Sequence, residues 1–271
     1  MAEAGLAAGV ERIAEAFAAH GRRAALMPYL MGGFPSLEQS LEVGQAYVEH
    51  SDLMEVGIPF SDPLADGPAI QAAGMRALEA GATFERVLDE VVAPLSQRVP
   101  VVVMCYANVL VNRGFAQAAG ALAGRGAAGL IVPDMPAVEA GELRLACDEA
   151  GVALVPLVAP TTPPDDVRRI AESARGFVYV VSVTGVTGER SALPPELGEV
   201  VERVREAAKV PVAVGFGVGT PQQVAEVGSI ADGVIVGSRL VRAIAEAETL
   251  AGGLKDVGSF LEDSTKLLDT G

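Results

Sequence analysis

The amino-acid sequence predicts an α/β fold: a single (β/α)8 TIM barrel that takes in residues 1–271 as one domain and carries an extra N-terminal helix. The chain length of 271 residues is usual for such a barrel. Short apolar runs alternate with helical stretches, and the apolar runs are continuous, as in parallel strands buried on both faces. An open, doubly wound sheet is the alternative, but the regular succession of eight strand–helix units favours the closed barrel.

Each expected strand is a short apolar run that ends at a turn signal. The eight runs are Ala25–Met31, Leu53–Val56, Val101–Cys105, Gly129–Val132, Ala153–Leu157, Phe177–Val181, Val212–Val214 and Gly233–Val236. Apolar residues at helical spacing or helix-start signals mark the stretches between them. Helices are expected at Val10–Ala19, Ser36–His50, Ala69–Leu78, Phe84–Leu95, Phe115–Ala123, Val138–Ala150, Thr162–Arg175 and Pro195–Ala207, with further helices after Thr220 and Gly237.

Three of the helix starts carry capping signals. Ser36 with Gln39 has the spacing of a capping box, and so does Thr220 with Gln223. Thr162 is expected to cap a helix whose first residue is Pro163. These signals predict where the chain leaves a loop and enters a helix.

Composition and charge exclude several classes of partner. The formal net charge of −15 argues against nucleic acid and against anionic membrane surfaces. No apolar run reaches the ~18–20 residues that a membrane span needs. The two cysteines, Cys105 and Cys147, lie in apolar contexts that are typical of buried free thiols in a reducing compartment. A cytoplasmic location is therefore expected, without nucleic-acid or membrane partners.

Carboxylates gather at the end of the second expected strand. Glu55 lies inside the strand, and Asp62 and Asp66 follow in a proline-rich loop. Catalytic groups of a barrel lie at the carboxyl ends of its strands, and a strand of a closed barrel has no solvated face for Glu55 to occupy. Asp66 before Gly67 and Asp62 before Pro63 also suit turns. Glu55, supported by Asp66, is the best candidate acid/base group.

Glycines follow the last two expected strands, where barrels often bind phosphate on backbone N–H groups. Gly215 and Gly217 follow the seventh strand, and Gly237 with Ser238 follows the eighth and opens a helix. Tight turns are the alternative use of such glycines. Neutral backbone dipoles would also allow this acidic chain to hold an anion.

Other catalytic chemistries lack candidates in the sequence. The three lysines, Lys209, Lys255 and Lys266, lie at no strand end, so a Schiff base has no candidate. The two histidines, His20 and His50, end helices, so a histidine-bearing metal site is poorly supported. The Gly- and Thr-rich stretch 182–190 fits either a lid over a site or an ordinary surface loop.

A series of motifs resembles the tryptophan synthase alpha chain family. The long motif Glu55-Val-Gly-Ile-Pro-Phe-Ser-Asp-Pro-Leu-Ala-Asp-Gly-Pro68 is highly specific, and the others follow it in family order across about Met27 to Arg242. They are Tyr106-Ala-Asn108, Pro133-Asp-Met-Pro136, Ala159-Pro-Thr161, Gly176-Phe-Val-Tyr179, Gly185-Val-Thr-Gly188, Gly215-Phe-Gly217 and Asp232-Gly-Val-Ile-Val-Gly-Ser238.

The resemblance implies a barrel that cleaves indole-3-glycerol phosphate to indole and glyceraldehyde 3-phosphate. Carried over by position, Glu55 would be the general acid/base and Asp66 would accept a hydrogen bond from the indole N–H. The remaining positions implied to contact substrate are Tyr29, Tyr106, Tyr179, Thr187, Gly188, Gly217, Gly237 and Ser238, the last four through phosphate and Thr187 also by meeting Asp66. No metal and no cofactor are implied for this chain.

The resemblance also implies a partner, a beta chain that carries pyridoxal phosphate and forms an alpha2beta2 heterotetramer with the alpha chain. The positions implied to face it are Pro59, Asp62, Pro63, Asn108 and Pro136. Three positions depart from the family pattern: Met31, Phe34 and Val183. They leave Glu55 and Asp66 untouched and bear on the loop that would close over the site.

Three other functions remain open at this point. The chain could release free indole without a partner, or it could be a poor catalyst that mainly activates a partner. It could also be another phosphosugar barrel, such as an isomerase. Intact Glu55 and Asp66 argue against the second of these, and the Pro-Phe-Ser-Asp-Pro stretch at 59–63 argues against the third.

Overall fold

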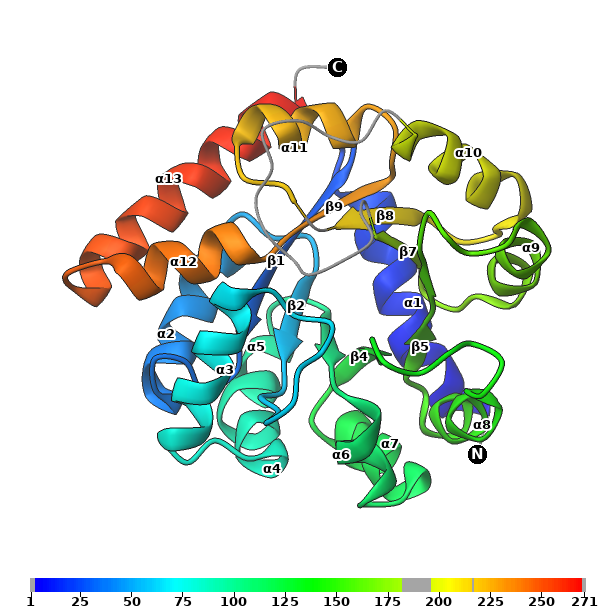
Figure 1. Ribbon diagram of the computed structural model, residues 1–271, viewed down its shortest axis with the longest axis horizontal. Coiled ribbons are helices and arrows are strands. Elements are labelled where there is room, and N and C mark those ends of the chain that lie inside the picture. The colour runs from blue at the N-terminus through cyan, green and yellow to red at the C-terminus, as the bar shows by residue number, and fades with distance from the viewer. Residues whose placement is uncertain (1–2, 182–195, 216, 270–271) are drawn as a thin grey trace.

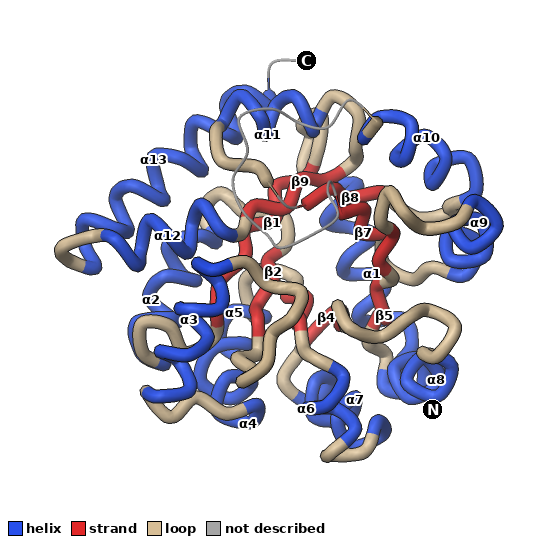
Figure 2. Tube along the Cα trace, viewed as in Figure 1, coloured by secondary structure: helices blue, strands red, loops and turns tan. Residues whose placement is uncertain are grey.

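Nine parallel strands form the centre of the molecule, and helices surround them (Figure 1, Figure 2). The computed structural model of the chain describes residues 3–181, 196–215 and 217–269. The strands are β1 Ala25–Met31, β2 Met54–Gly57, β3 Val101–Met104, β4 Ala127–Ile131, β5 Ala153–Val155, β6 Leu157–Val158, β7 Val178–Val181, β8 Val212–Gly215 and β9 Gly233–Val236. Nearly all their side chains are buried, as the continuous apolar runs predict.

The sheet closes on itself at Pro156. Its strand order is β5-β4-β3-β2-β1-β9-β8-β7-β6, so the two end strands are consecutive in the chain. The expectation of one strand over Ala153–Leu157 is wrong in detail, because β5 pairs with β4 while β6 pairs with β7. Pro156 between them has no N–H to donate, and its carbonyl accepts from the Tyr179 N–H at 2.9 Å. The predicted (β/α)8 barrel is confirmed.

The helices follow the strands in the expected alternation. They are α1 Glu3–Ala19, α2 Leu37–Val48, α3 Pro68–Glu79, α4 Phe84–Val87, α5 Ala93–Ser96, α6 Ala107–Val111, α7 Phe115–Gly124, α8 Gly141–Ala150, α9 Pro164–Ser173, α10 Leu197–Ala207, α11 Pro221–Gly228, α12 Ser238–Glu246 and α13 Leu250–Asp269. A π-helical turn, Leu88–Val92, joins α4 to α5, so the predicted stripe at 84–95 is one helical run. Helix α6 was not predicted.

Three predicted helix starts are wrong, and one capping box is confirmed. Helix α1 begins at Glu3 rather than Val10. Helix α8 begins at Gly141 rather than Val138, since 136–140 form turns. Thr162 does not cap α9; its hydroxyl accepts from the Ala159 N–H at 3.0 Å within its own turn. The capping box of Thr220 and Gln223 is present in full, and the Ser36 hydroxyl accepts from the Gln39 N–H. At these two starts the side chain of the cap residue bonds to the N–H of the third helical residue, whereas the Thr162 hydroxyl bonds within the turn before α9.

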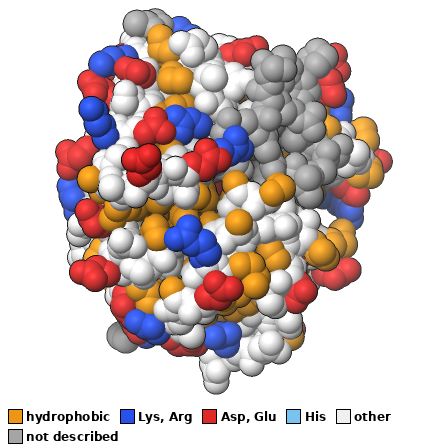
Figure 3. All heavy atoms as spheres, turned by 60° about the vertical axis from the view of Figure 1, so that its left-hand side comes forward, with side chains coloured by type: hydrophobic (Ala, Val, Ile, Leu, Met, Phe, Trp, Pro, Cys, Tyr) orange, Lys and Arg blue, Asp and Glu red, His pale blue; other side chains and the backbone are white. Residues whose placement is uncertain are grey.

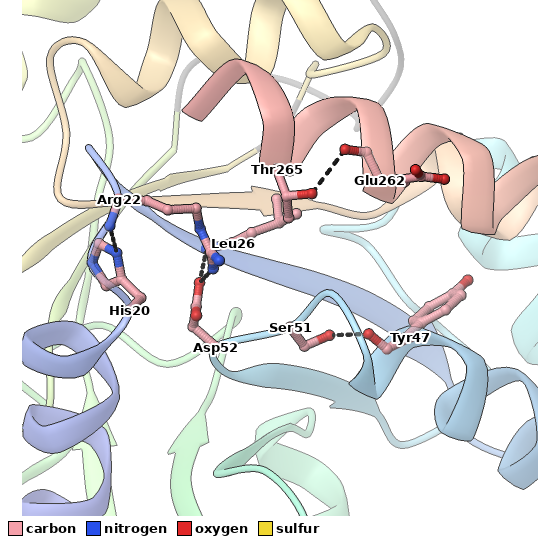
Figure 4. Close-up of polar contacts among 8 residues, drawn as sticks. All are labelled: His20, Arg22, Leu26, Tyr47, Ser51, Asp52, Glu262 and Thr265. Atoms are coloured by element: carbon pink, nitrogen blue, oxygen red, sulfur yellow. Dashed lines mark hydrogen bonds and ion pairs between the residues drawn. The ribbon is translucent and has the colours of Figure 1, made fainter. Parts of the chain in front are cut away.

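The amino ends of the strands are covered by α1 and fixed by ionic contacts. The Arg12 guanidinium donates to the carbonyls of Gly126 and Ser96 at 2.8 and 2.6 Å. Asp52, just before β2, pairs with Arg22 and accepts from the Leu26 N–H of β1 at 2.8 Å (Figure 4). These contacts fix the bottom of the barrel and leave the carboxyl ends of the strands for a site.

Candidate active site

Side chains from several strand ends converge on one cavity at the carboxyl end of the barrel. Glu55 comes from β2 and lies beside Tyr29 of β1 in the strand register, and Asp66 comes from the loop between β2 and α3. The cavity holds about 30 Å³. Its described lining is Tyr29, Glu55, Asp66, Ile70, Met104, Tyr179, Gly217, Val218, Ile235, Gly237 and Ser238. The structure therefore brings together seven of the site residues that the sequence predicted.

The Glu55 carboxyl is buried without a stabilising partner. Its side chain is 1% exposed, and neither oxygen has a hydrogen-bond partner among the described residues. Burial, and secondarily the charge of Asp66, raises the pKa of Glu55 to about 8. Glu55 is thus mostly protonated at neutral pH and can donate a proton into the cavity.

Asp66 also lines the cavity and is buried. Its backbone is fixed by its N–H, which donates to the Pro63 carbonyl at 3.1 Å, and by its carbonyl, which accepts from Gln71 at 2.8 Å. Burial raises the pKa of Asp66 to about 6, although a hydrogen bond from Tyr106 acts to lower it. At pH 7 Asp66 is mostly ionised while Glu55 is mostly protonated, which is the division that acid/base chemistry requires.

Two tyrosines enter the barrel over glycines on the neighbouring strands. A Cβ on Gly57 would lie 2.1 Å from the Tyr29 hydroxyl, and a Cβ on Gly215 would lie 2.2 Å from that of Tyr179. Gly215 thus makes room for Tyr179, whereas the sequence suggested a phosphate loop for it. Gly57 received no role from the sequence. A glycine ending an apolar strand beside a tyrosine-bearing strand is the signal that would have found both.

Gly217, Gly237 and Ser238 form the glycine-bearing side of the cavity. Gly217 has a φ of 80°, which favours glycine, so its turn alone explains the residue type. Gly237 is the N-cap of α12 and Ser238 its first residue, so the N–H groups of a helix start face the site. None of the described residues lining the cavity is Lys or Arg. An anion here would rely on backbone N–H groups.

Several predicted positions lie elsewhere. Thr187 and Gly188, and the departure Val183, lie outside the described residues, as does the whole 182–190 stretch. Tyr106 does not line the cavity; its hydroxyl accepts from the Ala65 N–H at 3.1 Å, one residue before Asp66. Among the implied partner positions Asp62, Asn108 and Pro136 are exposed and Pro63 is half-buried, whereas Pro59 is buried and offers no free surface.

The segments around those partner positions also expose large apolar side chains that the sequence analysis did not single out. Leu64 is 86% exposed, Val111 57% and Val138 71%. Each lies within three residues of an implied partner position. Val111 is the last residue of α6, whereas Leu64 and Val138 lie in loops.

A larger groove of about 1060 Å³ lies along α8, α9 and the ends of β4, β5 and β6. Its walls are mostly apolar, and Pro136 and Val138 are among them. Neither Glu55 nor Asp66 reaches it. The two carboxyls with displaced pKa values lie in the smaller cavity, which makes it the candidate site.

Two further surveys cover the described residues only. Within residues 3–181, 196–215 and 217–269, no group of three or more His, Cys, Asp or Glu side chains is arranged to hold a metal ion. No helix of that same part of the chain is long and apolar enough to cross a membrane.

Fold and site together define a (β/α)8-barrel protein with a paired-carboxylate site at the carboxyl ends of its strands. Residues 16–266 match the family model described as tryptophan synthase alpha chain. The alpha chain of Prochlorococcus marinus MIT 9313 is 50% identical over 246 residues, covering 89% of this chain and 88% of that protein. That of Carboxydothermus hydrogenoformans is 46% identical over 87% of this chain and 90% of its own.

Solved structures agree with the sequence relatives. A tryptophan synthase structure from Mycobacterium tuberculosis superposes with a TM-score of 0.87 at 37% identity, covering 96% of this chain and 99% of that one. The alpha subunit of Legionella pneumophila Paris gives a TM-score of 0.87 at 31% identity, covering 97% and 99%. The chain belongs to the tryptophan synthase alpha chain family, and its activity is that of a lyase in tryptophan biosynthesis.

Proposed function

We propose that the cavity cleaves indole-3-glycerol phosphate with Glu55 as general acid/base and Asp66 as the stabilising carboxylate. The observation that carries this assignment is the burial of two carboxyls in one cavity with pKa values of about 8 and about 6. Glu55 donates its proton to C3 of the indole ring, which makes the ring an electron acceptor. Asp66 accepts a hydrogen bond from the ring N–H and stabilises the positive charge that develops there.

Bond cleavage then needs a base, and it needs no cofactor. The Glu55 carboxylate removes the proton of the hydroxyl on the carbon attached to C3. As the C–C bond breaks, its electron pair returns to the ring, giving indole, and the hydroxyl carbon becomes the aldehyde of glyceraldehyde 3-phosphate. Glu55 ends the cycle protonated, so protons and electrons balance. Because the ring itself takes up the electrons, the step needs no Schiff-base lysine.

Substrate contacts follow from the lining of the cavity. We assign the phosphate to the backbone N–H groups around Gly217, Gly237 and Ser238, with Gly188. Tyr29 and Tyr179 would flank the ring, and Thr187 would meet Asp66. The cavity is about 30 Å³, so binding an indole ring requires some of its walls to move.

We further propose that a beta chain carrying pyridoxal phosphate binds this chain as an alpha2beta2 heterotetramer. Exposed Asp62, Asn108 and Pro136 support that surface, together with Leu64 and Val138 beside them. This chain itself would need no cofactor. We infer a cytoplasmic location, which suits the two buried free thiols of Cys105 and Cys147.

The test is indole release from indole-3-glycerol phosphate by the purified chain, alone and with a beta chain, with Glu55→Gln as control. Slow release that rises strongly with the beta chain and disappears in the variant is the expected result. Fast release by the chain alone would favour the alternative, a stand-alone lyase that liberates free indole. Absence of release under both conditions would refute the proposed substrate.

A further inference from the structure

Asp66 is the last residue of a four-residue turn, residues 63–66, that lies between β2 and α3. The Asp66 N–H donates to the Pro63 carbonyl at 3.1 Å, which closes the turn. Leu64 inside the turn is 86% exposed, so the turn buries little apolar surface of its own. The position of the turn therefore depends on hydrogen bonds from neighbouring elements.

One side chain of α3 binds both ends of this turn. Nε2 of Gln71 donates to the Asp66 carbonyl at 2.8 Å and to the Pro63 carbonyl at 3.3 Å. The NH2 group of a glutamine carries two N–H donors, so it can serve both carbonyls at once. An ionised carboxylate of the same length could serve neither, because it only accepts hydrogen bonds. The contact therefore depends on the chemistry of the amide rather than on the bulk of the side chain.

We propose that Gln71 is a positioning residue, whose amide holds the turn at residues 63–66 so that the Asp66 carboxylate lies in place for the substrate N–H. The proposal rests on the proposed function of Asp66 as the acceptor of that N–H. Gln71 is not among the described residues that line the cavity, so it acts through Asp66 and makes no contact with substrate.

Helix α3 provides a fixed base for this contact. It packs against β1 and α12, and Ile70, the residue before Gln71, is buried and lines the cavity. Side chains of a helix point toward its N-terminus, so Gln71 in the fourth position of α3 reaches back to the turn. A second element holds the same turn, since the Tyr106 hydroxyl accepts from the Ala65 N–H at 3.1 Å. Loss of the Gln71 amide should therefore loosen the turn without releasing it completely.

Loss of the Gln71 amide has a defined kinetic signature. Asp66 is assigned to stabilise a charge that develops in the transition state, so its misplacement should lower kcat more than it raises KM. We expect Gln71→Met to lower kcat by about ten-fold. A role limited to stability would instead lower the melting temperature and the folded fraction, which circular dichroism reports, and would leave kcat per folded chain unchanged.

The experiment measures kcat, KM and amide hydrogen exchange by NMR in the full chain, in Gln71→Met and in the matched control Gln39→Met. Gln39 is likewise a half-buried glutamine near the start of a helix, α2, and it lines neither the cavity nor the larger groove. Exchange at the Asp66 N–H, which closes the turn, should become about ten-fold faster in Gln71→Met and stay unchanged in Gln39→Met. The Tyr179 N–H, bonded to the Pro156 carbonyl in the barrel, is the internal reference, because a global loss of stability would speed its exchange as well.

A second variant keeps the test valid if Gln71→Met does not fold. Gln71→Glu keeps the length of the side chain and, when ionised, has no donor for either carbonyl, so the same losses are expected. Unchanged kcat per folded chain, unchanged exchange at the Asp66 N–H, or equal effects in Gln39→Met would overturn the role of Gln71. Failure of the wild-type chain to cleave indole-3-glycerol phosphate would refute the proposed function instead, because hydrogen exchange needs no substrate and still shows whether Gln71 holds the turn.

Discussion

At the scale of single residues, Glu55 and Asp66 show how one chain gives two carboxyls different protonation states. Glu55 sits in a strand among apolar side chains with neither oxygen hydrogen-bonded within the described chain. Asp66 sits in a loop, where the Tyr106 hydroxyl acts to lower its pKa. Burial raises the pKa of both carboxyls, but among the described residues only Asp66 has a neighbouring hydroxyl, that of Tyr106, that acts against this shift. The difference in environment, rather than in side-chain chemistry, separates acid from base.

Glu55→Gln should abolish indole release and stabilise the fold at alkaline pH. The pKa of Glu55 is raised from 4.5 to about 8, so between these values the folded state keeps a proton that the unfolded state has lost. Stability from this residue is therefore highest at acid pH and falls as pH rises through the window. The neutral amide removes that dependence, and we expect a gain of about 1–3 kcal/mol at pH 8.

Thermal unfolding of wild type and Glu55→Gln at pH 5 and pH 8 provides the measurement. The variant should melt higher at pH 8, with a smaller difference at pH 5. A variant that melts lower than wild type at pH 8 would mean that Glu55 is stabilised by a partner when ionised. Retained indole release would contradict its catalytic role.

The pH dependence of kcat/KM should be bell-shaped. Asp66 must be ionised to accept a hydrogen bond and Glu55 must be protonated to donate, so activity should fall below pH about 6 and above pH about 8. The charge of Asp66 contributes to the raised pKa of Glu55, so the two values belong to a coupled pair. Initial rates from pH 5 to pH 9.5 are the measurement. A profile that stays flat through pH 9 would exclude Glu55 as the acid.

At the scale of elements, the strands are set by neighbouring strands as much as by their own residues. The run Ala153–Leu157 is one apolar stretch in the sequence but two strands in the barrel, because its partners differ on either side of Pro156. A neighbouring strand also sets the direction of the Tyr29 ring in β1, because that ring lies over Gly57 of β2. Strand positions were predictable from apolar runs, whereas these contacts depend on pairing between segments distant in sequence.

Gly57→Ala should lower kcat/KM by roughly ten-fold or more, because the new Cβ would meet the Tyr29 hydroxyl at 2.1 Å and displace its ring beside Glu55. Tyr29→Phe in the same chain should recover part of the loss, since it removes the closest atom but leaves ring carbons at 2.8 and 3.0 Å. A double-mutant cycle on kcat/KM measures this coupling. Strictly additive effects would show that the two residues do not meet.

At the scale of the whole molecule, closure of the barrel brings loops from β2, β3 and β4 to one end. That end carries the cavity and, beside it, the exposed Leu64, Val111 and Val138. On the face in Figure 3, acidic and basic side chains lie interspersed, and no basic patch of the kind that binds nucleic acid gathers there. That residues 1–271 form one domain stays a prediction.

Val138→Asp should weaken activation by a beta chain while leaving the basal indole release of the isolated chain unchanged. A charge would enter an apolar contact at a side chain that is 71% exposed and outside the cavity. Leu145→Asp is the matched control, since Leu145 of α8 is 64% exposed but lies in none of the implied partner loops. Titrating indole release against beta chain gives the apparent Kd. Equal effects of both variants would contradict the proposed surface.

The sequence by itself determined the barrel, and it singled out Glu55 and Asp66 and the glycines of the last two strand ends as candidate site residues. Apolar runs, helix spacing and a charge inside a strand are local signals, so they can be read along the chain. Only the tertiary structure decided that Gly57 and Gly215 make room for tyrosines and that Pro59 is buried. These facts depend on which distant segments touch, and on how far burial shifts each proton equilibrium, and no local pattern encodes either.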